Sequence, residues 1–176
     1  MPISIFKTLA NIFKQTGVTA VLIGGYAVNA HKVTRHTVDI DFLIGKDDFE
    51  KLFAELQHIG YAIAHRQDAF VQLNGKGLRD IDLMLSDIDT VNTIYETGDR
   101  VTIAGEQFVT PSLNNLLALK LHSIRWNPHR ELVDLPDIIL LLQANDVDIE
   151  SAEIKELFEK YGTRELYRKA QKSFRY

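Results

Sequence analysis

Residues 22–44 read LIGGYAVNAHKVTRHTVDIDFLI, and they decide the fold because a glycine turn precedes two carboxylates in an apolar strand. Side chains alternate between the faces of a strand, so Asp39 and Asp41 project to one side, about 6 to 7 Å apart. Ile40 and Phe42 project to the other, apolar side. Like charges two residues apart resist burial and favour a cation, and oxygen ligands suit Mg²⁺. The stretch predicts a metal site; a solvated strand end is the alternative interpretation.

A third carboxylate comes from residues 78–85, LRDIDLML, which repeat the alternation of polar and apolar side chains. If the two strands are neighbours, Asp82 joins Asp39 and Asp41. Asp80 is the alternative, and Asp82 is preferred because it lies deeper in the apolar run. Three converging carboxylates can hold two divalent ions, one to lower the pKa of an attacking hydroxyl and one to clamp a triphosphate.

Polar and glycine residues near this pair are candidates for binding phosphate. Gly24 and Gly25 allow close approach of the backbone, and a helix beginning at about Tyr26 would point free N–H groups at a phosphate. Gly-Gly as a plain turn is the alternative. Arg35 can neutralise phosphate, and Thr37 can bind it or simply fill a β-strand position.

The order and spacing of these residues resemble the nucleotidyltransferase superfamily with the DNA polymerase beta fold, in the pattern Gly24-Gly25, Arg35-x-Thr37-x-Asp39-x-Asp41 and Asp82. Within it, the chain is similar to the AbiEii and MenT group of nucleotidyltransferase-like toxins, over roughly residues 21–142. The resemblance implies NTP as substrate, two Mg²⁺ ions on the three aspartates and an acceptor hydroxyl on a tRNA 3′ end or a protein side chain. It also implies an antitoxin partner.

The segment PSLNNLLALKLHSI, residues 111–124, resembles the lysine-bearing helix of that group. Lys120 falls in the apolar stripe of this helix and needs an anionic partner or a route to water. By resemblance Lys120 contacts phosphate, together with Ser123. Snorkelling of the lysine head to solvent is the alternative.

Asp134-Leu-Pro-Asp137 resembles the later Lys-Asp-x-x-Asp motif of the group, with two departures. Val133 stands where the group has lysine, and Arg130 is one residue further from Asp134 than the pattern's arginine. The alternative places Asp134 at the N-cap of a helix and Asp137 in its first turn. The roles of Asp80, Arg130, Asp134 and Asp137 stay open.

The periodicity predicts an α+β fold, a mixed sheet flanked by helices in residues 1–110 and a helical cap in residues 111–176, with the nucleotide between them. Strands are expected at 19–23, 38–44, 60–65, 69–74, 79–85, 100–103 and 106–109. Helices are expected at 4–15, 26–32, 47–58, 88–96, 112–126, 132–144, 150–161 and 164–174.

Composition narrows the class of protein. The 176 residues are 45% hydrophobic and contain no cysteine, which excludes a disulfide framework and a thiolate nucleophile. No apolar run approaches the ~20 residues of a membrane helix, and the N-terminus lacks the features of a secretory signal. A cytoplasmic location and no membrane partner are expected. The six histidines show no i, i+4 pair, which argues against a histidine metal site.

The C-terminal segment is basic, although the whole chain has a net charge of −4. Arg164, Arg168 and Lys172 recur every four residues, and Lys169 and Arg175 add charge. Such a ridge can bind the phosphates of an RNA acceptor. A solvated helix face is the alternative.

Two other functions compete with nucleotidyl transfer. A non-catalytic nucleotide-binding or interaction module on the same fold would explain the departures at Arg130 and Val133. The three retained carboxylates argue against it, because buried acids without a cation cost stability. A Mg²⁺-dependent phosphohydrolase ranks last, since no separate nucleophile motif is present.

Overall fold

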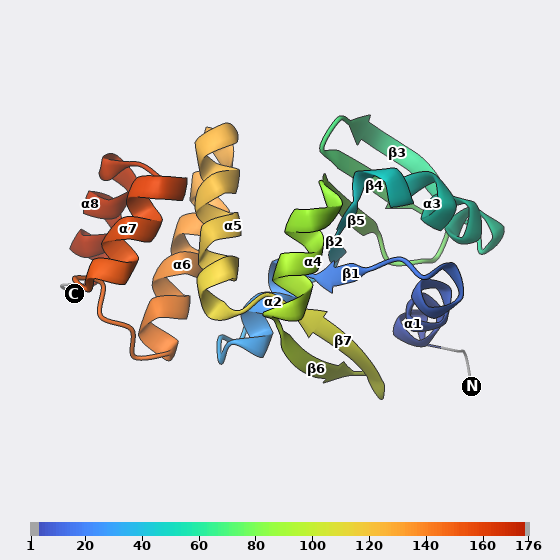
Figure 1. Cartoon of the computed structure of the whole chain (residues 1–176), viewed down its shortest axis with the longest axis horizontal. Coiled ribbons are helices and arrows are strands. Elements are labelled where there is room, and N and C mark those ends of the chain that lie inside the picture. The colour runs from blue at the N-terminus through green and yellow to red at the C-terminus, as the bar shows by residue number, and fades with distance from the viewer. Residues whose placement is uncertain (1–3, 175–176) are drawn as a thin grey trace. The chain divides into compact units, whose positions relative to one another are not determined.

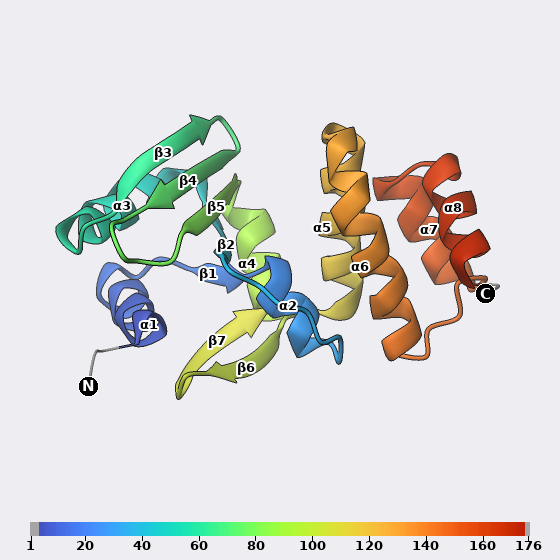
Figure 2. The same ribbon diagram turned by 180° about the vertical axis from the view of Figure 1, so that it is seen from behind.

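The computed structural model describes residues 4–174 and divides into two compact units. Residues 1–27 and 35–112 form an α/β unit, and residues 28–34 and 113–176 form a helical unit. The strands all belong to the first unit, and the helices that follow residue 112 belong to the second (Figure 1, and from behind in Figure 2).

A five-stranded mixed sheet is the centre of the α/β unit, in the order β1-β2-β5-β4-β3. The central strands β2 and β5 are parallel, and the other neighbouring pairs are antiparallel. This mixed sheet with flanking helices confirms the predicted α+β class. The strands are β1 (Ala20–Leu22), β2 (Ile40–Gly45), β3 (Ala62–Gln67), β4 (Phe70–Asn74) and β5 (Ile81–Ser86).

Helices and a separate hairpin complete this unit. The helices are α1 (Ile5–Thr16), α2 (Gly24–Ala30, which continues into the helical unit), α3 (Phe49–His58) and α4 (Ile88–Glu96), with a short 3₁₀ turn η1 (Lys46–Asp48) before α3. The hairpin consists of β6 (Asp99–Ile103) and β7 (Glu106–Thr110).

The core of the α/β unit fixes β2 and β5 by their apolar faces. Ile81, Leu83 and Leu85 alternate as buried residues along β5, and Ile40 and Phe42 are fully buried in β2. α1 contributes Phe6, Leu9 and Ile12 to the same cluster. The intervening polar residues of both strands therefore face away from this core.

The helical unit contains α5 (Leu113–Trp126), η2 (Pro128–Arg130), α6 (Glu131–Ala144), α7 (Ala152–Tyr161) and α8 (Arg164–Phe174). Leu117 and Leu121 of α5 and Ile138 and Leu141 of α6 are among its buried residues. Along residues 4–174, every helix is too short or too polar to cross a lipid bilayer.

Several predicted boundaries differ from the structure by one or two residues, and the differences in α2, β2 and α6 concern candidate site residues. α2 begins at Gly24 rather than near Tyr26, and β2 begins at Ile40, so Asp39 lies in a bend before the strand. α6 begins at Glu131, so Asp134 is inside the helix and is not its N-cap. The reason lies upstream: Asn127 accepts the backbone N–H of His129 and starts the η2 turn, which leads directly into α6.

Candidate active site

Asp41 and Asp82 occupy directly opposed positions on the parallel strands β2 and β5. Each is half-buried, and each lies between two fully buried apolar neighbours on its own strand. Paired residues on neighbouring strands point to the same face of a sheet, so the two carboxylates share the face opposite the core. The structure thus brings Asp82 next to Asp41.

Asp39 stands immediately before β2, in the irregular segment 33–39. Its backbone oxygen accepts a hydrogen bond of 3.2 Å from the Thr37 hydroxyl. Its charge reaches Asp82, because it contributes to the raised pKa of that residue. Asp39 is therefore electrostatically part of the cluster although it is outside the strand.

The electrostatics of Asp82 are those of a carboxylate that lacks a counter-charge. Burial, followed by the charges of Asp41 and Asp39, raises the pKa of Asp82 to about 6, while a hydrogen bond from Gln72 opposes the rise. Gln72 is the partner of Asp82 on the neighbouring strand β4. The Oδ1 atom of Asp82 is buried and has no hydrogen-bond partner within the described residues. A buried oxygen of this kind is costly unless a donor or cation binds it.

Gly24 and Gly25 allow the start of α2 to lie against this cluster. Gly24 has φ +63°, and a Cβ there would lie 2.1 Å from Asp41 Oδ2. A Cβ on Gly25 would lie 2.6 Å from the Thr37 Cβ. The backbone N–H of Ile23 donates to the Asp41 carbonyl at 2.9 Å. The glycines are therefore required for contact between the turn and Asp41 and Thr37, whatever they do for a ligand.

Arg79 is a residue that sequence reasoning missed. Its Nη2 donates to the Thr37 carbonyl at 2.9 Å, its Nη1 donates to the Tyr26 hydroxyl, and its guanidinium lies 5.7 Å from the Tyr26 ring centroid. The Tyr61 hydroxyl donates to the Arg79 carbonyl at 2.8 Å. Arg79 thus ties α2 and the segment before Asp39 to the start of β5. In the sequence, the one feature that could have pointed to Arg79 is its position directly beside an apolar strand.

The carboxylate oxygens of the three aspartates are suitable ligands for a hard divalent cation, although the side chains do not surround a single ion position. Among residues 4–174, no three His, Cys, Asp or Glu side chains are placed so as to coordinate a single ion. Asp39, Asp41 and Asp82 nevertheless supply only oxygen atoms, one of them buried without a donor. Mg²⁺ prefers such ligands.

Lys120, expected to contact phosphate, has two carboxylate partners in the helical unit. Its Nζ donates to Asp134 Oδ1 at 2.8 Å and to Asp137 Oδ2 at 2.7 Å, and all three residues are buried. Arg130 donates from Nε to Asp134 Oδ2 at 3.0 Å. Burial disfavours ionisation of Asp134, but Lys120 and Arg130 outweigh it and hold its pKa below the usual value. Ser123 lies half-buried, further along α5.

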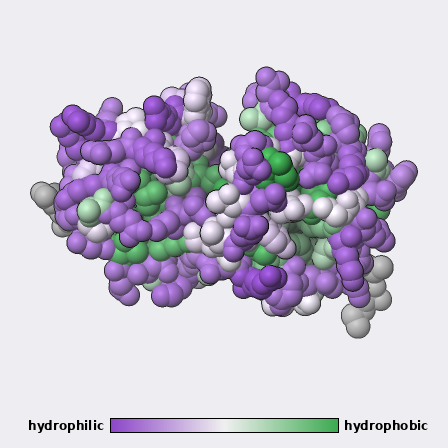
Figure 3. Space-filling view, viewed as in Figure 1, coloured by the Kyte–Doolittle hydropathy of each residue, from purple (hydrophilic) through white to green (hydrophobic). Residues whose placement is uncertain are grey.

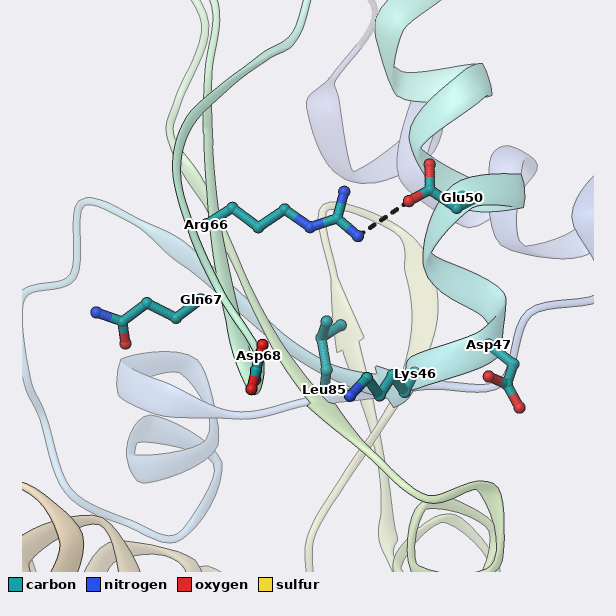
Figure 4. A pocket seen from close by; sticks show the side chains of 7 residues that line it. All are labelled: Lys46, Asp47, Glu50, Arg66, Gln67, Asp68 and Leu85. Atoms are coloured by element: carbon teal, nitrogen blue, oxygen red, sulfur yellow. Dashed lines mark hydrogen bonds and ion pairs between the residues drawn. The ribbon is translucent and has the colours of Figure 1, made fainter.

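A separate cavity of about 550 Å³ lies at the other end of β2 and β5 (Figure 4). It begins where β2 runs into Lys46 and where β5 reaches Leu85, whereas Asp41 and Asp82 lie near the starts of these strands. Arg66 and Glu50 form an ion pair of 3.0 Å beside it. Its charges are mixed and partly paired, so it is not part of the carboxylate cluster. The lining residues are Lys46, Asp47, Glu50, Arg66, Gln67, Asp68 and Leu85.

Solved structures of similar fold are nucleotidyltransferases. The solution structure of the antibiotic-resistance factor ANT(2'')-Ia has a TM-score of 0.63 at 14% identity, covering 97% of this chain and 92% of that chain. The lincomycin-bound lincosamide antibiotic adenylyltransferase LnuA has a TM-score of 0.58 at 20% identity, covering 80% and 95%. A putative nucleotidyltransferase from Thermotoga maritima has a TM-score of 0.56 at 14% identity, covering 73% and 88%. At these identities the likeness shows the fold.

Family assignment rests on the sequence itself. No curated protein sequence matches the chain significantly. The model of a family described as "Uncharacterised nucleotidyltransferase" matches residues 3–172, nearly the whole chain. With its mixed sheet and its opposed aspartates, the chain belongs to this family of nucleotidyltransferases, enzymes that transfer a nucleoside monophosphate.

Proposed function

We propose that this enzyme uses Mg²⁺ to transfer a nucleoside monophosphate from an NTP to an acceptor hydroxyl, with release of pyrophosphate. The observation that carries the proposal is the buried, unpartnered Oδ1 of Asp82, on the strand position opposite Asp41. A protein that did not use this oxygen would gain stability by replacing it with an apolar or amide group.

The three aspartates have distinct roles in this proposal. Asp39 and Asp41 hold the metal, and Asp82 shares it and helps to remove the proton of the acceptor hydroxyl. Burial and the charges of Asp41 and Asp39 raise the pKa of Asp82 in the metal-free protein, and a bound cation would relieve this repulsion. Bound Mg²⁺ would lower the pKa of the attacking hydroxyl and neutralise charge on the triphosphate.

Binding of the triphosphate is assigned to the polar groups around the cluster. These are the backbone N–H groups at the start of α2, where Gly24 lies against Asp41 and Gly25 lies against Thr37. The side chains of Thr37 and Arg35, in the segment before Asp39, are the further candidates. Phosphate contacts from Lys120 and Ser123 stay a prediction. To bind a triphosphate, the Lys120 ammonium group would have to do so while paired with Asp134 and Asp137, or leave them.

The acceptor and the biological role are proposed from resemblance. A tRNA 3′ end or a protein side chain would be the acceptor, and the enzyme would act as an AbiEii- or MenT-like toxin neutralised by an antitoxin. Neighbours of similar fold include an enzyme complexed with adenylyl-2''-tobramycin and one bound to lincomycin, so antibiotics belong among the acceptors to be tested.

A non-catalytic nucleotide-binding module is the second candidate. One observation favours it: Asp134 and Asp137 already neutralise Lys120, so this lysine offers less positive charge to a triphosphate. Such a module would bind NTP without turnover.

The deciding experiment incubates the purified protein with Mg²⁺ and each α-³²P-labelled NTP in turn. Separate reactions contain total tRNA, no added acceptor, tobramycin or lincomycin, and both the macromolecules and the small molecules are resolved. Label in one acceptor establishes transfer and names the base. The Asp39→Ala/Asp41→Ala variant should lose it.

A matched control keeps the test specific. Asp47→Ala/Asp68→Ala removes the same charge from the cavity at the far end of the sheet and should retain transfer. Mg²⁺-dependent NTP binding without label in any acceptor would favour the non-catalytic module.

A further inference from the structure

α8 carries a row of cations that the carboxylate cluster does not use. Arg164, Arg168 and Lys172 are exposed and recur every four residues, which puts them on one face of the helix, about 6 Å apart along its axis. None of the three forms an ion pair with another residue in the range 4–174. Arg175, the expected extension of the row, lies outside the described residues.

Lys169 shows the contrast on the same helix. Its Nζ lies 2.7 Å from Glu131 Oε1 and 3.0 Å from Glu165 Oε1, and these carboxylates raise its pKa. Glu131 and Glu165 are therefore directed to Lys169, and Glu150, which also contacts α8, pairs with Lys155 and accepts hydrogen bonds from Tyr167 and Gln171. The row of Arg164, Arg168 and Lys172 keeps its positive charge.

The positive charge of α8 is opposite in sign to the net charge of the whole chain. α8 holds four basic residues and a single acidic one, whereas the whole chain has a net charge of −4. A local positive field of this kind attracts phosphate groups. Hydrophilic side chains cover much of the surface in Figure 3, with hydrophobic surface between them.

A groove of about 320 Å³ runs beside the row, between α7 and α8. The half-buried Tyr167 ring forms its aromatic part and packs edge-on against the buried Phe158 ring, 5.3 Å away between centroids, and Arg164 and Arg168 form its basic rim. Tyr167 is fixed by a 3.0 Å hydrogen bond from its hydroxyl to the Ile149 carbonyl. The lining residues are Lys155, Phe158, Glu159, Thr163, Arg164, Tyr167, Arg168 and Gln171.

We propose that this surface of α8 and the adjoining groove bind a single-stranded nucleic acid. The row spans about 12 Å from Arg164 to Lys172, enough for a few consecutive phosphates. Arginine forks bind phosphate oxygens in pairs, and a groove with an aromatic part accommodates an unpaired base. A duplex has no unpaired base for the groove. Binding at this surface does not depend on nucleotidyl transfer.

The test measures binding of the full chain to fluorescein-labelled oligo(U) and oligo(dT) of about 10 nucleotides by fluorescence anisotropy. EDTA is present, so metal binding at the aspartates plays no part, and the salt concentration is varied between about 50 and 200 mM. Replacement of the row, Arg164→Gln/Arg168→Gln/Lys172→Gln, should weaken binding about tenfold or more. It should also reduce the slope of log affinity against log salt by about 2.

Controls separate the row from charge in general. Lys7→Gln/Lys14→Gln/Lys76→Gln removes the same charge from exposed sites of the α/β unit and should change the affinity by less than about twofold. Lys169→Gln should behave similarly, because that lysine is already paired. Asp39→Ala/Asp41→Ala should bind like the wild type, which separates this inference from the proposed activity. Circular dichroism checks that each variant is folded.

Several results would overturn the inference. One is no binding at about 50 mM salt, and another is an equal loss of affinity in both triple variants. A third is tighter binding of poly-glutamate or of an anionic vesicle than of either oligonucleotide. Comparison of oligo(U) with oligo(dT) then assigns the ligand to RNA or DNA.

Discussion

Asp41 of β2 and Asp82 of β5 are direct partners in the parallel register that joins the two central strands of the sheet. Two carboxylates in this relation repel each other, and the charge of Asp41 is the second largest cause, after burial, of the raised pKa of Asp82. The pair is tolerated because apolar neighbours on both strands hold it in place. The repulsion can be measured in the folded protein.

Stability without metal should depend on the protonation of Asp82. Its pKa of about 6 is above the ordinary value of 3.8, so the folded protein keeps a proton that the unfolded chain loses in this range. The free energy of unfolding in EDTA should therefore fall as pH rises from about 4 to 6, and stay lower above it. After a discount for solvent screening, the fall is on the order of 1 kcal/mol. Urea denaturation of the wild type and Asp82→Asn measures it, and an unchanged pH slope in the variant would contradict the assignment.

Mg²⁺ with NTP should raise the melting temperature of the wild type. At a hundredfold excess over Kd, binding adds about 2.7 kcal/mol, which corresponds to about 5–10 °C for a chain of this size. Differential scanning calorimetry should show no such increment for Asp41→Asn, even if that variant is more stable in EDTA. Asp68→Asn is the matched control, and it should keep the increment because Asp68 lies in the separate cavity.

Gly24→Ala should abolish activity by displacing Asp41. The new Cβ would lie 2.1 Å from Asp41 Oδ2, and a shift of about 1 Å in a catalytic group can lower the rate by about 10²-fold. Gly17→Ala is matched, because Gly17 has φ +67° against +63° for Gly24 and no atom within 4 Å of the position that its new methyl group would take. Both variants should lose about 1 kcal/mol from the positive φ, measured by urea denaturation. Only Gly24→Ala should lose nucleotidyl transfer, and equal activity of the two variants would show that the close contact is dispensable.

Lys120→Met should destabilise the helical unit by about 3–5 kcal/mol, because it removes the ammonium group that Asp137 and Asp134 share in the interior and leaves Asp134 with Arg130 alone. The lowered pKa of Asp134 means that the wild-type pairing adds stability above the ordinary pKa and loses it as pH falls through the lowered value. In Lys120→Met the pH dependence should be opposite, and the free energy of unfolding should rise as the pH falls. Urea denaturation at several pH values checks both statements.

A double variant separates the two roles of Lys120. Lys120→Met/Asp137→Asn leaves Asp134 paired with Arg130, so part of the stability should return. If activity returns with it, Lys120 acts through packing of α5 against α6. If stability returns and activity does not, Lys120 contacts the triphosphate, as the family resemblance implies.

Local patterns account for what the sequence could predict. The alternation of buried and half-buried residues along β5 was readable in LRDIDLML, and it placed Asp82 on the correct face. The helix predicted at 164–174 matches α8, because the Thr163 hydroxyl accepts the N–H of Leu166 and starts the helix at a residue type known for this role. Both features depend on residues close together in the chain.

Other features depend on tertiary contacts that no local pattern contains. The sequence indicated that Lys120 needs an anionic partner, but only the packing of α5 against α6 selects Asp134 and Asp137. The alternative that placed Asp134 at the N-cap of this helix was wrong, because Asn127 and Pro128 begin a helical turn upstream and α6 starts at Glu131. Arg79 went unnoticed for the same reason, since its partners Thr37 and Tyr26 lie about 40 to 50 residues away.

The parallel pairing of β2 with β5 also has a consequence for biosynthesis. The two strands are separated in the chain by α3 and the β3–β4 hairpin, and β5 must insert between β2 and β4 to complete the sheet. Pairing across such a sequence distance is slow compared with formation of a hairpin. On the ribosome, a nascent chain that ends before Ser86 carries Asp39 and Asp41 but lacks the complete strand that brings Asp82 to them. Asp39, Asp41 and Asp82 can therefore come together only after β5 is translated and paired, later than the synthesis of the first two aspartates.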